Sequence, residues 1–234
     1  MFPARICSTI LALAITPLVA ADLTISDDAP LELPKPGAHQ LRILTPHLLE
    51  LTLITTKKTP AAPPDPWNLV DRQNRLHAPD PKTFQVLVDG KPVAVQSVGF
   101  KRRVLYAPLK ERDLRIGNYL YLQLGGLITS NQTAEVRTTD PKLWPASTRF
   151  SARDDPLRWS PAIHVNQAGY LPAFPKTALV GYYLGSFGEL EVVKAISQGG
   201  ETSSGFQVLD RDGKVAFAGR LKPRGDQGFP FATY

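Results

Sequence analysis

The acidic side chains that could catalyse hydrolysis are poorly spaced for it. Asp154 and Asp155 form an internal acidic pair, but hydrolysis by a general acid and a general base needs two carboxyl groups that face each other across a cleft. Adjacent residues before a proline are more typical of a solvated turn. Asp210 and Asp212 flank a second turn, but a calcium loop would need an oxygen ligand at Val208 and a glutamate at Gly219. We therefore predict no catalytic carboxylate here.

Metal and nucleophile chemistry is equally unsupported. The histidines lie far apart in the sequence, and there is one cysteine; these residues are His39, His47, His77, His164 and Cys7. The sequence has no nucleophile elbow, phosphate loop, HExxH or dinucleotide fingerprint. We predict no metal site, no cofactor and no cofactor-binding residues.

The three tryptophans are the best candidates for binding a ligand. Trp67, Trp144 and Trp159 all lie in proline-rich segments, and a flat indole ring can stack on the apolar face of a pyranose. The alternative is that these rings wedge the linker onto a domain face, because large aromatic side chains usually bury their area in packing. The sequence leaves both roles open.

Residues 1–21 are typical of a secretory signal. Arg5 is followed by a short apolar run and by small residues that end at Ala21; an uncleaved anchor helix is the alternative. We expect a secreted or periplasmic protein with no membrane contact after cleavage. Cys7 lies inside the signal, so the exported chain would have no disulfide. The net charge of +6 could suit nucleic acid, but export argues against that partner.

The elements that must position these residues are predicted to be strands. Among 234 residues there are 22 prolines and 17 glycines, and no stretch keeps a 3.6-residue period. Residues 40–55 read as two strands bent at Pro46, and Asp89-Gly90 predicts a tight hairpin. Further strands are expected at 97–106, 119–124 and 134–138. Lys101-Arg102-Arg103 would be an exposed strand edge.

This pattern predicts an all-β chain with an N-terminal β-sandwich over residues 22–139. Residues 59–81 form a long proline-rich loop, and residues 140–162 a linker with anchoring aromatics. A second, incomplete sandwich follows over residues 163–234. Its expected strands are 178–184 and 190–193, and a hairpin pairs 206–209 with 214–219.

The second region resembles a known family. The run Ile163-His-Val-Asn166-Gln167-Ala-Gly169-Tyr170-Leu-Pro172, with Pro175-Lys176 after it, resembles the opening motif of the cellulase N-terminal immunoglobulin-like domain, and the 206–219 hairpin resembles its next element. The family-motif residues that we assign a structural role are Asn166, Gln167, Gly169, Tyr170, Pro172 and Lys176.

Elementary chemistry accounts for this motif without catalysis. Val165 would point into a core, and Asn166 and Gln167 would hydrogen-bond turn backbone. Gly169 would allow either a positive φ or the close approach of another strand. Tyr170 would bury its ring and leave its hydroxyl at an edge. The alternative is direct sugar contact by Tyr170 or His164.

The resemblance implies a function. In family-nine glycoside hydrolases this domain precedes a helical catalytic barrel, which here would follow Tyr234. The expectation is a non-catalytic immunoglobulin-like region of an exported, cellulase-type glycosidase in polysaccharide catabolism, with the barrel as its partner. The alternative is a free carbohydrate-binding or cell-surface adhesion module that uses Trp67 and its loop, with polysaccharide as its partner. The reading frame after Tyr234 would separate the two.

Overall fold

The structure is a computed structural model that describes residues 33–56, 66–110, 113–166, 168–192 and 205–224. The predicted signal (1–21) and Gln167 lie outside the described residues, so these two predictions remain untested.

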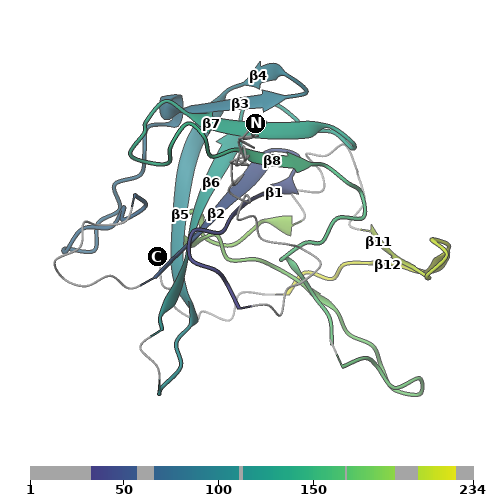
Figure 1. Cartoon of the computed structure of the whole chain (residues 1–234). Coiled ribbons are helices and arrows are strands. Elements are labelled where there is room, and N and C mark those ends of the chain that lie inside the picture. Colours follow the sequence, from purple (N-terminus) through teal and green to yellow (C-terminus); the bar gives the residue numbers. More distant parts are fainter. Residues whose placement is uncertain (1–32, 57–65, 111–112, 167, 193–204, 225–234) are drawn as a thin grey trace, which may run out of the picture.

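Four strands form the first antiparallel sheet, in the order β1-β2-β6-β5 (Figure 1). They are β1 (His39–Thr45), β2 (Leu48–Thr56), β5 (Val95–Tyr106) and β6 (Arg115–Leu124). The turn between β1 and β2 contains Pro46, which cannot donate to the ladder. Because β1 and β2 pair in antiparallel fashion, the predicted bend at Pro46 is a full reversal of the chain.

The second sheet lies across the first and has the order β4-β3-β7-β8 (Figure 1). Its strands are β3 (Phe84–Val88), β4 (Lys91–Val93), β7 (Thr133–Thr138) and β8 (Phe150–Arg153), and the 3₁₀ turn η1 (Pro81–Thr83) leads into β3. Read in chain order, the two sheets correspond to strands A-B-E-D and C′-C-F-G of an immunoglobulin-like sandwich. The predicted all-β immunoglobulin-like fold is confirmed.

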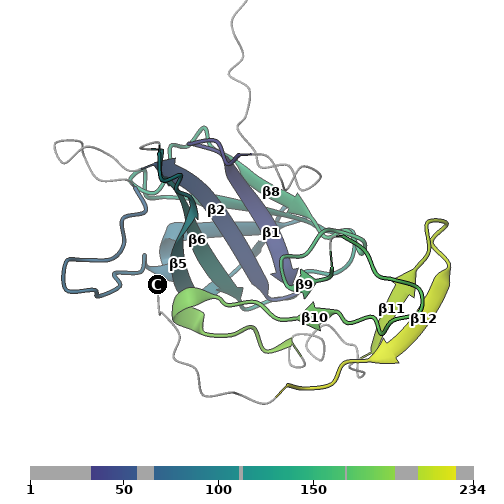
Figure 2. The same ribbon diagram turned by 90° about the horizontal axis from the view of Figure 1, so that it is seen from below.

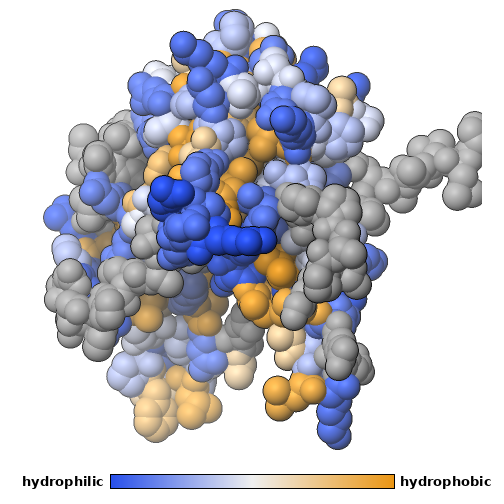
Figure 3. Space-filling model, turned by 90° about the vertical axis from the view of Figure 1, so that its left-hand side faces the viewer, coloured by the Kyte–Doolittle hydropathy of each residue, from blue (hydrophilic) through white to orange (hydrophobic). Residues whose placement is uncertain are grey.

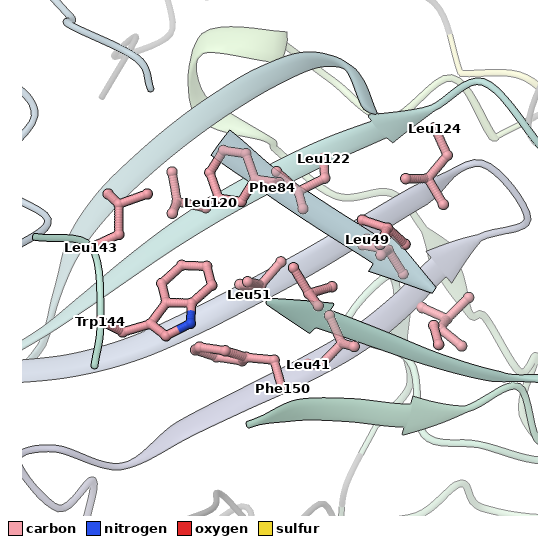
Figure 4. Packing of buried hydrophobic residues seen from close by; sticks show 14 of the residues in the cluster. Leu41, Leu49, Leu51, Phe84, Leu120, Leu122, Leu124, Leu143, Trp144 and Phe150 are labelled. Carbon is pink, nitrogen blue, oxygen red and sulfur yellow. The ribbon is translucent and has the colours of Figure 1, made fainter. Parts of the chain in front are cut away.

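The core of the sandwich lies between these two sheets (Figure 4). Alternate residues of β1 are buried, as expected for a strand with one face toward a core. Residues 118–122 of β6 are buried on both faces, so another segment of the chain must cover the outer face of the first sheet. The labelled core side chains in Figure 4 include Leu41, Leu49, Leu51, Phe84, Leu120, Leu122, Leu124, Leu143, Trp144 and Phe150.

The predicted linker over residues 140–162 needs correction, because its first half belongs to the sandwich. β8 pairs with β7, and Leu143, Trp144 and Phe150 lie in the core. The burial of these three large apolar side chains fixes the segment to the sandwich, which is not expected of a linker. The sandwich therefore extends past residue 139, through Arg153.

The rest of the described chain has little regular structure. β9 (Ile163–His164) pairs with β10 (Leu179–Val180), and β11 (Gly205–Leu209) pairs with β12 (Val215–Arg220) as the predicted second hairpin. Of the strand expected over 178–184, only β10 forms. Residues 190–192 are not in a strand, because this part of the chain turns through the 3₁₀ element η2 (Gly185–Phe187) against the sandwich. Within the described ranges, no helix is long and apolar enough to cross a membrane.

Candidate functional site

The predicted family motif folds as a loop fastened by its own polar groups. The Asn166 side-chain oxygen accepts a hydrogen bond from the Ala168 amide (3.0 Å). The Tyr170 hydroxyl accepts from the Asn166 amide (3.0 Å) and donates to the Thr177 carbonyl. Gly169 has φ +95°, which confirms the expected positive φ. The phenol therefore ties the start of the loop to its end.

Lys176 closes the same loop from within. Its Nζ donates to the carbonyls of Leu171 (3.1 Å), Pro172 (2.7 Å) and Phe174 (2.9 Å). An ammonium has three N–H donors, and these three bonds use all of them. The side chain therefore stabilises the loop and has no proton left to offer a ligand.

Two expectations about this motif are wrong. Val165 is 54% exposed and Tyr170 is 37% exposed, because the described strands β9 and β10 are two residues each and provide no sheet face to bury them. The Tyr170 hydroxyl, expected to be left at an edge, instead makes two hydrogen bonds within the loop. His164 bonds the Gly181 carbonyl through Nε2 (2.9 Å) across the β9–β10 pair.

Two of the three tryptophans are core residues. Trp67 is 1% exposed, packs against Trp144 and Phe150, and donates its Nε1–H to the Leu143 carbonyl (2.9 Å). Trp144 lies edge-on to Phe150, with ring centroids 4.9 Å apart. Neither indole has a free face, so neither can stack on a sugar. The alternative role, fastening proline-rich segments to the sandwich, is the one they have.

Trp159 remains a candidate for stacking. The residue is 45% exposed, and the Arg42 guanidinium lies 4.7 Å from the ring centroid. Such a cation against one face holds the indole in place while leaving part of it accessible. The structure does not bring the three predicted tryptophans into one platform.

The acidic and histidine candidates have local roles. Asp154 is buried and forms an ion pair with Arg158 (2.6 Å), so the expectation of a fully solvated turn holds only for Asp155, which caps the Leu157 amide. Asp210 accepts from two amides of its own turn. Among the described residues, no group of three or more His, Cys, Asp and Glu side chains could hold a metal ion.

Sequence reasoning missed a charged cluster on the outer face of the first sheet. Glu50 of β2 is 0% exposed. Its Oε1 pairs with Arg42 of β1 (3.2 Å), and its Oε2 accepts from the Tyr182 hydroxyl (2.6 Å). Tyr182 lies in residues 182–190, which we call the docking segment. Alternation along β2 places Glu50 opposite the core, but the sequence gives no sign that a segment 132 residues away covers it.

Lys101 is the second charge in this cluster. It was expected on an exposed edge; β5 is indeed an edge strand of its sheet, but Lys101 is 7% exposed. Its Nζ donates to the Tyr183 carbonyl (2.7 Å). Burial lowers the pKa of Lys101 to about 8, against the opposing attraction of Glu50. Burial also raises the pKa values of Tyr121 and Tyr182.

The docking segment fits the sheet closely enough to require glycines. A β-carbon at Gly99 would lie 2.7 Å from the Phe187 ring, and one at Gly185 (φ +62°) would lie 2.2 Å from the Phe100 carbonyl. Ser186 Oγ accepts from the Phe100 amide (2.9 Å), so it occupies part of the open edge of β5. Figure 2 shows the segment with η2 beside β5.

Many large apolar side chains are exposed in the described part of residues 158–224. Phe217 is 59% exposed, and many other large apolar side chains in this stretch are exposed too. The exposed large apolar residues of this stretch include Ile163, Val165, Leu171, Phe174, Leu179, Phe206, Val208, Val215 and Phe217. Figure 3 shows apolar surface at the lower end of the molecule, where the tip of the β5–β6 hairpin also lies.

The comparisons assign a family to this same stretch. Residues 158–233 match the family model of the cellulase N-terminal ig-like domain. We call residues 158–233 the cellulase-type segment. The match spans about a third of the chain and includes both the motif and the second hairpin, which confirms the resemblance. Comparison with curated proteins and with solved structures finds no match.

Proposed function

We propose that this chain is a non-catalytic immunoglobulin-like region of an exported glycoside hydrolase, in which the cellulase-type segment braces a catalytic barrel of the family-nine type. The sandwich would act as a rigid mount for that segment. The barrel is a separate domain that the chain would contact, and polysaccharide would be the barrel's substrate.

The observation that carries this proposal is the exposed apolar surface of the cellulase-type segment. β11 and β12 place Phe206, Val208 and Phe217 on one face, because Val208 pairs with Phe217 and side chains alternate along each strand. All three are exposed. Exposed apolar patches on soluble proteins mark interaction sites, and the family match names a domain of cellulases.

The test uses residues 22–234 together with a purified family-nine catalytic domain from the same organism, made without its own immunoglobulin-like domain. The chain alone should release no reducing sugar from soluble β-glucans, and it should raise the thermal midpoint of the catalytic domain. Phe206→Ser with Phe217→Ser should abolish that increase. Val104→Ser is the matched control, because Val104 is 58% exposed but lies on β5 of the sandwich, and it should keep the effect.

Two results would overturn the proposal. The bracing role fails if the catalytic domain melts at the same temperature with and without the chain. The non-catalytic role fails if the chain itself turns over β-glucan and loses that turnover in Asp154→Asn with Asp155→Asn.

A second candidate function, direct carbohydrate binding, rests on Trp159 alone. Its indole is partly exposed and fixed against Arg42, which is the arrangement a sugar-stacking ring needs. Affinity electrophoresis in gels that contain β-glucan would measure retardation of the chain. Trp159→Ala should remove the retardation, whereas Leu157→Ala, an exposed apolar neighbour, should not. Equal mobility of wild type in gels with and without glucan would exclude this function.

A further inference from the structure

The feature that carries a further inference is the ammonium of Lys101, which is enclosed between the sandwich and the docking segment. Besides its bond to the Tyr183 carbonyl, Nζ lies 4.0 Å from the ring centroid of Tyr182, 4.7 Å from that of Tyr119 and 5.4 Å from that of Tyr121. Tyr182 and Tyr183 come from the docking segment, so undocking would remove part of what encloses this lysine.

The charges around Lys101 compensate its burial incompletely. Glu50 of β2 attracts the ammonium, but Arg42 of β1 and Arg103 of β5 repel it. Both carboxylate oxygens of Glu50 are already engaged, one by Arg42 and one by the Tyr182 hydroxyl. The other titratable groups packed around the ammonium are the phenols of Tyr119, Tyr121 and Tyr182. Their ring faces attract a cation and offset part of the desolvation, which remains the largest influence on the Lys101 amine.

We propose that the docking segment is a pH-dependent latch: it holds most tightly to the sandwich when the Lys101 amine is neutral, and it loosens when Lys101 takes up a proton. A neutral amine keeps its hydrogen bond to the Tyr183 carbonyl and avoids the cost of a buried cation.

Proton linkage gives the direction in which docking changes with pH. With the segment docked the pKa of Lys101 is about 8, below the ordinary value of 10.5 to which it returns on exposure. The undocked form therefore binds more protons between these two values, and raising the pH across this window favours docking. Tyr121 and Tyr182 act in the opposite sense, because docking raises their pKa values above 10.0. Docking should therefore be tightest at about pH 9–10.

The latch would set how firmly the sandwich holds the cellulase-type segment. The docking segment follows β10 directly, and the Gly181 amide bonds the Ala162 carbonyl next to β9. Loosening the latch would therefore release the strand pair that bounds the motif loop. Under the proposed function this changes the rigidity of the mount, but the latch itself does not depend on that function.

The experiment is quench-flow hydrogen exchange on the full chain, with rates divided by the intrinsic rate at each pH. The reporters are the amides of Leu184 and Leu190, which bond the carbonyls of Gly188 and Tyr182 within the docking segment. In wild type their protection should rise about tenfold between pH 7 and pH 9. Amides of β3, in the second sheet, should show no such rise.

Variants make the assignment specific. Lys101→Met should give pH-independent protection that is already high at pH 7, and Lys101→Arg should stay weakly protected at both pH values, because arginine does not deprotonate in this range. Lys214→Met, an exposed lysine beside β12, should behave as wild type. The proposal is overturned if wild type shows no rise, or if Lys101→Met is less protected than wild type at pH 7.

Discussion

The sandwich and the cellulase-type segment both contain antiparallel strand pairs, but different interactions stabilise them. In the sandwich, two four-stranded sheets enclose one apolar cluster. In residues 158–224, two-stranded pairs leave most of their large apolar side chains exposed. Isolated two-stranded pairs are marginally stable in water, so the docking segment and the self-bonded motif loop are what order this part. Burial of apolar side chains in its core stabilises the sandwich, whereas contacts of the docking segment with the sandwich stabilise the cellulase-type segment.

This contrast predicts the largest effect for a tryptophan of the sandwich. Trp67→Ala removes a buried indole and its bond to Leu143, and should lower the free energy of unfolding by about 3–5 kcal/mol. Phe217→Ala, an exposed aromatic of β12, should change it by less than about 0.5 kcal/mol. Urea denaturation followed by circular dichroism measures both. Equal losses would remove the distinction between the two regions.

The next effect tests the attachment itself. Gly99→Ala places a β-carbon against the Phe187 ring and should cost about 1–3 kcal/mol, with proteolysis accelerated within the docking segment and not within β3. Phe187→Ala should relieve the clash, so the double variant should be more stable than the sum of the single losses. Strict additivity in the urea midpoints would mean that these residues do not meet.

A smaller, local effect is expected in the motif loop. Lys176→Met removes three hydrogen bonds to carbonyls that solvent can replace, so global unfolding should change by about 1 kcal/mol or less. Proteolytic cleavage between residues 166 and 177 should nevertheless become faster. Unchanged cleavage would show that the Tyr170 bonds alone hold the loop.

The smallest effect concerns a comparable loop of the sandwich region. Asp71 accepts hydrogen bonds from His77 and Arg75, which lower its pKa to about 2. A lowered carboxyl pKa favours the folded loop above the ordinary value of 3.8, and this advantage is lost as the pH falls through about 2. Carboxyl ¹³C shifts should titrate near pH 2 in wild type. His77→Ala removes one donor and should move the midpoint upward, whereas His164→Ala, outside this loop, should leave it unchanged.

The sequence predicted those parts of the fold whose cause is local. Asp89-Gly90 predicted a hairpin and both residues have positive φ, and the turn at Asp210 was placed correctly. The linker prediction failed because it rested on the prolines near Trp144 and Phe150. The burial of these two side chains depends instead on the opposite sheet. Nothing near Lys101 in the sequence indicates the tyrosines from residues 182 and 183 that cover it. Contacts that join residues more than 80 positions apart leave no periodic signature.

The close approach of Gly99 to Phe187 also has a consequence for the history of this chain. A larger residue at position 99 fits only if position 187 becomes smaller, so neither position can change freely alone. In related chains the two positions should therefore vary together, glycine with an aromatic ring and a bulkier residue with a small one. A chain with alanine or valine at position 99 and phenylalanine at position 187 would need different contacts between its sandwich and its cellulase-type segment.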